Sequence, residues 1–131
     1  MALDISNFLY VVLMFFMFCM GTCLSQEFIT DSNFDDKIAK DITVVEFWAG
    51  WNESNQFNEL NKLNDCNANR IDIMTYMDIQ NEYNVSAIPT IIVFDNGVEK
   101  CRFKPNIMFQ LEASKKTVQQ SVDTITLNKF Q

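Results

Sequence analysis

The sequence ITVVEFWAGW occupies residues 42–51 and decides the fold of this chain. Residues 42–48 are β-branched or aromatic apart from one carboxylate, Glu46, and this pattern predicts a buried central strand. A second apolar run, TIIVF at residues 90–94, starts directly after Pro89 and predicts another buried strand. Strands without a polar face need helices on both sides to cover them.

A hairpin follows the second of these strands. Residues 95–97 are Asp-Asn-Gly, which favours a tight turn, and residues 98–103 predict the returning strand. Basic side chains on this part of the chain share one face: Lys100, Arg102 and Lys104. We interpret this basic stripe as the solvated side of an edge strand rather than as an anion site.

The remaining patterns alternate between strands and helices. Short strands are predicted at residues 27–29, 71–77 and 107–111. Helices are predicted where apolar residues recur three or four positions apart: Phe34 and Ile38 after residues 30–32, then Phe57, Leu60 and Leu63 after residues 52–55, then Val118, Val122 and Ile125 after Ser114. This order predicts an α/β fold with a mixed central sheet and helices on both faces.

An apolar stretch precedes these elements. Residues 8–24 contain no charged side chain, and their length falls between a signal-peptide core and a membrane span. We predict that residues 1–25 form a hydrophobic N-terminal helix, either a membrane anchor or a signal-like segment, and that residues 26–131 form the domain. The chain is then membrane-anchored or exported, to a periplasm, a secretory lumen or a particle, and is not plainly cytosolic.

Composition narrows the classes of function. The 131 residues include 17 acidic and 10 basic side chains, and the net charge of −7 argues against nucleic acid as a partner. The chain has no His, which excludes catalytic triads and metal sites built on imidazole. We expect no cofactor, no metal and no small-molecule substrate. The expected partners are proteins, with a membrane contacted through residues 8–24.

Two motifs resemble the thioredoxin family. Residues 44–51, VVEFWAGW, look like the strand that leads into that family's redox site, and YNVSAIPT at residues 83–90 looks like its cis-proline loop. The hairpin at residues 95–97 fits the same pattern. The resemblance covers about residues 26–128 and implies a thioredoxin fold in which the Ile88–Pro89 peptide is cis.

The resemblance also implies a loss. The family signature is W-C-G-P-C-K, whereas Trp51 is followed here by NESNQ. Asn52 and Asn55 stand where the resemblance places the two redox cysteines, and a carboxamide cannot attack a disulfide. We therefore expect a redox-inactive member of the family that has no catalytic residue.

Other positions of the motif take non-catalytic roles in this interpretation. Glu46 aligns with the family's buried carboxylate, and we expect it to be hydrogen-bonded structurally. A candidate docking groove is formed by Trp51, Ile88, Pro89 and Thr90, because the family groove pairs with an extended partner segment. Either a partner or the chain's own segment 105–111, longer than the family's, is expected to cover it.

The cysteines do not restore redox chemistry. Cys19 and Cys23 lie in the apolar stretch, and Cys66 and Cys101 belong to no C-x-x-C motif. We expect Cys66 and Cys101 to be free thiols, with a disulfide between them as the alternative.

Three functions remain in competition. The first is a non-catalytic structural or docking subunit of a larger membrane or viral-particle assembly. The second is a membrane-tethered or exported holdase that binds unfolded peptides through the same groove. The third, which is disfavoured, is a monothiol oxidoreductase that uses Cys66 or Cys101.

Overall fold

A four-stranded mixed sheet forms the centre of the computed structural model, which describes residues 28–131. The strands are β1 (Ile42–Trp48), β2 (Asn67–Asp72), β3 (Thr90–Asp95) and β4 (Val98–Phe103), in the order β2-β1-β3-β4. β1 runs parallel to β2 and antiparallel to β3, and β3 pairs antiparallel with β4. β1, the predicted central strand, is therefore central in the sheet.

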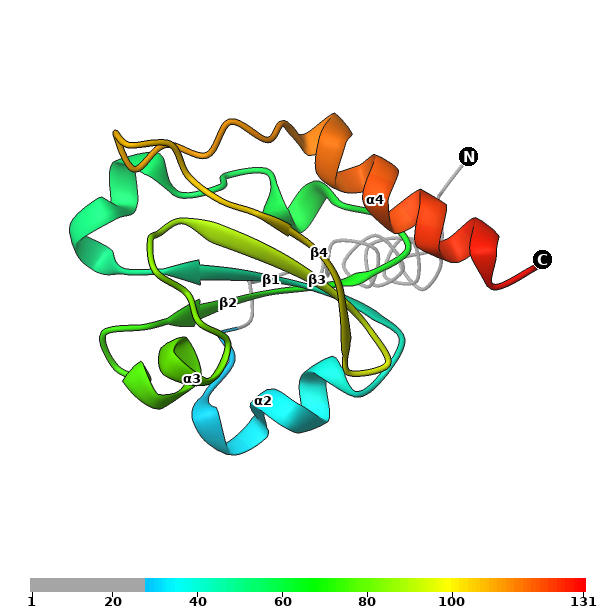
Figure 1. The fold of residues 1–131 in the computed structure, drawn as a ribbon, viewed down its shortest axis with the longest axis horizontal. Coiled ribbons are helices and arrows are strands. Elements are labelled where there is room, and N and C mark those ends of the chain that lie inside the picture. The colour runs from blue at the N-terminus through cyan, green and yellow to red at the C-terminus, as the bar shows by residue number, and fades with distance from the viewer. Residues whose placement is uncertain (1–27) are drawn as a thin grey trace, which may run out of the picture.

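Helices cover both faces of this sheet (Figure 1). The α-helices are α2 (Asp31–Ile38), α3 (Met77–Glu82) and α4 (Lys115–Asn128), and two short 3₁₀ helices are η1 (Gly50–Asn55) and η2 (Leu60–Lys62). α2 and α3 lie over one face, and α4 lies over the other (Figure 1). The predicted α/β fold with flanking helices is confirmed.

The face under α2 and α3 carries the aromatic half of the core. Phe34 of α2 is fully buried and makes ring contacts with Phe47, Tyr83 and Phe94 at centroid distances of 6.0, 5.1 and 6.2 Å. α2 begins where sequence predicted, because the Asn33 side chain accepts the Thr30 N–H at 2.9 Å. This half of the core packs against β1 and β3. The end of β1 and the start of β3 adjoin the candidate site described below.

The opposite face is aliphatic and is closed by α4. Val118 and Val122 are fully buried against Val44 and Val93 of the sheet. Ser114 is the N-cap of α4 and accepts the Thr117 N–H at 3.2 Å, as its position before the apolar pattern predicted.

The hairpin between β3 and β4 is also as predicted. Asn96 and Gly97 both have positive φ, at 48° and 82°, and the Gly97 N–H donates to the Ile38 carbonyl at 2.7 Å. On β4, Arg102 pairs with Glu99 at 2.8 Å, so the predicted basic stripe is partly neutralised within its own strand.

Three predicted elements are wrong. Residues 57–63 do not form an α-helix: their backbone bonds span three positions, as from the Leu60 N–H to the Phe57 carbonyl at 3.3 Å, and only the 3₁₀ helix η2 forms there. The strand predicted at 71–77 ends at Asp72, whose carboxylate accepts the Met74 N–H at 3.0 Å and starts a turn. Residues 107–111 form a loop closed by a single bridge between Pro105 and Leu111.

The predictions for residues 1–25 lie outside the described residues, as does Glu27 of the strand predicted at 27–29. Within that predicted strand, Phe28 forms an isolated parallel bridge with Arg70 at the edge of β2. Among residues 28–131, no helix has the length and apolar character needed to cross a membrane.

We predict that Phe34→Ala lowers the free energy of unfolding by about 3–5 kcal/mol, because it empties the centre of the aromatic cluster. Phe130→Ala is the matched control, since Phe130 is 85% exposed, and its effect should stay within about 0.5 kcal/mol. Urea unfolding measures both, and a Phe34 variant as stable as the control would contradict this description of the core.

Candidate functional site

Asn52 is the centre of the candidate site. It lies in η1 directly after β1, and only 5% of it is exposed. Its Nδ2 donates to the Ile88 carbonyl at 3.2 Å and to the Phe109 carbonyl at 3.1 Å, while its Oδ1 accepts the Asn55 Nδ2 at 2.7 Å. The carboxamide is therefore satisfied on both sides, and it joins η1 to two distant parts of the chain.

The first of these parts is the turn before β3. The Ile88–Pro89 peptide is cis, as expected from the resemblance. Ile88, Pro89 and Thr90 are all buried, and the Thr90 hydroxyl donates to the Ala87 carbonyl at 2.7 Å. The structure brings this turn next to Asn52, but it does not leave it open as a groove, since the Ile88 carbonyl is already bound.

The second part is the segment 105–111, which folds back on itself around one side chain. Asn106 Oδ1 accepts the N–H groups of Met108 and Gln110 at 2.9 and 3.1 Å, and the Asn106 N–H donates to the Gln110 carbonyl at 2.9 Å. Phe109 has a positive φ of 56° at the end of this turn. The geometry aims the Phe109 carbonyl at Asn52.

The outer surface of the site is aromatic and aliphatic. Trp51 is 61% exposed, and its ring meets the Phe109 ring edge-on, with centroids 5.6 Å apart and an interplanar angle of 86°. Ile107 and Met108, at the tip of the segment, are 97% and 66% exposed. Of the four predicted groove residues, Trp51 alone is exposed, and the other three are covered.

A buried ion pair binds the backbone at Phe57, two residues after η1. Glu46 Oε2 lies 2.7 Å from Arg70 Nε, its neighbour in the β1–β2 register, and both side chains are almost completely buried. Glu46 Oε1 accepts the Phe57 N–H at 2.7 Å, and Arg70 Nη2 donates to the Phe57 carbonyl at 3.3 Å. The pair therefore holds both backbone polar groups of Phe57, which is the structural role expected for Glu46.

Burial raises the pKa of Glu46 from its ordinary value of 4.5, although the Phe57 N–H and the Arg70 guanidinium oppose this rise. A raised pKa means that the folded protein binds this proton more tightly than the unfolded chain. The contribution of Glu46 to stability is thus greatest below pH 4.5 and declines as the pH rises toward the raised pKa.

Neither described cysteine belongs to the site. Cys66 and Cys101 are free thiols, so the alternative of a disulfide between them is wrong. Cys66 precedes β2 and Cys101 lies on β4, at opposite edges of the sheet, roughly 14 Å apart at about 4.8 Å per strand. Burial raises the pKa of Cys66 to about 11 and also raises the pKa of Cys101.

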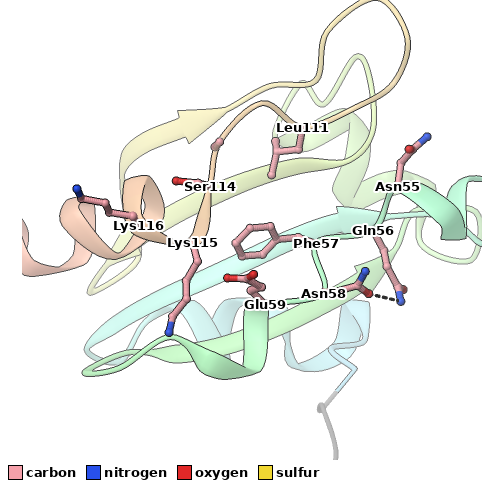
Figure 2. A pocket seen from close by; sticks show the side chains of 10 residues that line it. Asn55, Gln56, Phe57, Asn58, Glu59, Leu111, Ser114, Lys115 and Lys116 are labelled. Carbon is pink, nitrogen blue, oxygen red and sulfur yellow. Dashed lines mark hydrogen bonds between the residues drawn. The ribbon is translucent and has the colours of Figure 1, made fainter.

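A cavity of about 570 Å³ opens beside the site, between residues 55–59 and the start of α4 (Figure 2). Phe57 stands at its centre, and Gln56 donates to Asn58 along one wall at 3.0 Å (Figure 2). Among residues 28–131, no group of three or more acidic or Cys side chains is placed to hold a metal ion. The cavity is lined by polar and charged side chains from both segments, among them Asn55, Glu59 and Lys115.

Sequence reasoning missed two residues of this site, Arg70 and Phe109. The sequence did offer a signal for Arg70. A carboxylate in a buried strand, such as Glu46, needs a partner of opposite charge, and Arg70 is that partner. No local pattern marks Phe109, since its role depends on a contact with Asn52 across 57 positions of the chain.

We predict that Arg70→Met destabilises the fold by about 3–5 kcal/mol, because it leaves the Glu46 carboxylate buried without its partner. Adding Glu46→Gln to this variant should recover part of the loss, because it removes the unpaired charge. Urea unfolding at neutral pH measures both. A double variant no more stable than Arg70→Met would show that the pair acts through something other than charge compensation.

Comparison with known proteins gives a consistent relationship. The thioredoxin family profile matches residues 25–123. Thioredoxin from Mycoplasma genitalium is 36% identical over 70 residues, 49% of this chain and 69% of that protein. Thioredoxin from Staphylococcus saprophyticus is 36% identical over 76 residues, 53% of this chain and 73% of that protein.

Solved structures show the same fold. A mutant thioredoxin from Halobacterium salinarum gives a TM-score of 0.60 at 16% identity, covering 76% of this chain and 88% of that one. Oxidised thioredoxin from Plasmodium falciparum gives 0.57 at 19% identity, covering 77% and 98%. The family profile spans residues 25–123, and the sheet order and the cis-proline turn agree with it, so the chain belongs to the thioredoxin family.

Proposed function

We propose that this protein is a redox-inactive member of the thioredoxin family that acts as a docking or structural subunit in a larger assembly. The observation that carries the proposal is the bonding of Asn52. Its carboxamide occupies the corner between η1 and the cis-proline turn and is fully engaged with Ile88, Asn55 and Phe109. Disulfide exchange needs a thiolate at such a corner, and a carboxamide has no equivalent chemistry.

The competing function is ordinary dithiol exchange, because the curated relatives are named thioredoxins. Two features of this chain weigh against it. The thiols of residues 28–131 lie on the edges of the sheet, away from Asn52. Their raised pKa values, about 11 for Cys66, also leave little thiolate at neutral pH, which disfavours a monothiol enzyme.

Docking is supported by what the site exposes. Trp51 and the tip of the segment 105–111 present large apolar side chains to solvent, while the cis-proline turn is covered by the chain itself. Exposed aromatic anchors beside a rigid support are typical of protein contacts. We therefore propose that a partner contacts Trp51 and this tip rather than pairing with the cis-proline turn.

A holdase is the second candidate, and the methionine side chains favour it. Met108 at the tip is 66% exposed, and flexible thioethers suit surfaces that accept several partners. In both versions we propose that residues 8–24 tether the domain to a membrane or lead its export, as their apolar sequence suggests.

We predict that the protein will not accelerate the reduction of insulin by dithiothreitol above the uncatalysed rate, because Asn52 and Asn55 offer no thiol. The Cys66→Ser/Cys101→Ser variant is the control for stray thiol chemistry. Acceleration by both proteins would contradict the redox-inactive assignment. Acceleration by the unsubstituted chain alone would point instead to a monothiol enzyme.

We predict that Trp51→Ala weakens binding to the natural partner by about 2 kcal/mol or more, because it removes an anchoring contact and the edge support of Phe109. The measurement is the recovery of copurified protein from the native source in mild detergent. Phe130→Ala truncates an aromatic residue that is 85% exposed and serves as the control. Equal recovery with both variants would remove Trp51 from the docking surface.

A further inference from the structure

The exposed large apolar side chains are concentrated at one end of the domain. We call this surface the apolar end and define it by six residues: Trp51, Met74, Met77, Ile107, Met108 and Phe109. Each of them is at least 46% exposed. All three methionines of residues 28–131 belong to this set.

The topology of the sheet places these residues at one end of the domain, with Met74 and Met77 on the α3 side and the segment 105–111 on the α4 side. β1 and β2 are parallel, with Trp48 paired to Asp72, so both strands finish at the same end of the sheet. The segments that follow them contain Trp51 and Met74–Met77. β4 finishes at this end as well. Its last residue, Phe103, pairs with Ile91 near the start of β3, and β3 starts opposite the end of β1. Figure 1 shows η1, the β2–α3 connection and the segment between β4 and α4 at one end of the sheet.

The charges around this surface are mainly negative. Glu53 follows Trp51 in η1, Asp72 and Asp78 flank the two methionines near α3, and Glu53 and Asp78 are exposed. At the base of the segment 105–111, Lys104 and Glu112 offset one another in charge. Lys115 and Lys116 lie at the start of α4, beside the cavity around Phe57 (Figure 2). The rim toward α3 is thus acidic.

We propose that the apolar end binds amphipathic peptide segments that carry Lys or Arg beside an apolar face. This inference rests on the proposed docking function and specifies the partner's chemistry. Methionine and aromatic side chains adapt to varied apolar faces, and the acidic rim selects a basic partner over an acidic one. The peptide's basic side lies toward Glu53 and Asp78.

The test uses two synthetic peptides with identical leucine positions, one with Lys and one with Glu at every polar position. The full chain, labelled with ¹³C at the methionine methyl groups and held in a zwitterionic detergent, is titrated with each peptide and followed by NMR. The Leu/Lys peptide should shift the signals of Met74, Met77 and Met108 saturably. The Leu/Glu peptide should bind at least about tenfold more weakly.

Matched variants separate selective binding from general attraction to an acidic protein. Glu53→Gln/Asp78→Asn should weaken the Leu/Lys peptide by roughly two- to tenfold. Asp41→Asn/Asp65→Asn removes the same amount of charge just before β1 and β2, and should change affinity less than about twofold. Both residues have a positive φ, which Asn tolerates.

A second pair of variants tests the apolar contact. Ile107→Ser/Met108→Ser should weaken binding about tenfold or more, whereas Leu127→Ser/Phe130→Ser should not.

Equal affinity for the two peptides, or equal losses from the two charge variants, would overturn the inference. So would binding that leaves the three methionine signals unchanged. None of these results would decide whether the protein is redox-inactive or whether it docks to a partner. Insulin reduction tests the first claim, and recovery of the copurified partner tests the second.

Discussion

A buried carboxamide must find partners for two N–H donors and one oxygen, and this requirement organises the site around Asn52. The side chain meets it by binding the Ile88 carbonyl, the Phe109 carbonyl and the Asn55 amide. An unpaired amide at this depth costs roughly 1–3 kcal/mol. The same side chain therefore holds η1, the cis-proline turn and the segment 105–111 in fixed positions relative to one another. Asn52 links the segment 105–111 to the cis-proline turn, because the Phe109 carbonyl completes this set.

A second constraint is electrostatic, and it acts on Phe57, two residues after η1. Glu46 and Arg70 face each other across the β1–β2 register and together hold the backbone of Phe57. Phe57 lies between η1 and η2 and lines the cavity beside α4. The buried carboxylate thus fixes the backbone at Phe57, just after η1.

Local chemistry made much of the fold predictable from the sequence. Ser114 caps α4, the Asn96-Gly97 turn joins β3 to β4, and the apolar run at residues 42–48 is the central strand. Predictions failed where distant partners decide the conformation. The Phe57 backbone is claimed by Glu46 and Arg70, and the loop around Asn106 is fixed by its own side chain and by Asn52. Neither competition is visible in the periodicity of the chain.

Amide hydrogen exchange in the segment 105–111 measures the role of Asn52 most directly. With the wild-type chain as reference, Asn52→Ala removes both hydrogen bonds to Ile88 and Phe109 while leaving the Asn106 turn intact. We predict that the Asn106 and Phe109 amides exchange about tenfold faster in the variant, while β3 amides are unchanged. Unchanged exchange at Asn106 and Phe109 in a folded variant would show that Asn52 does not hold this segment in place.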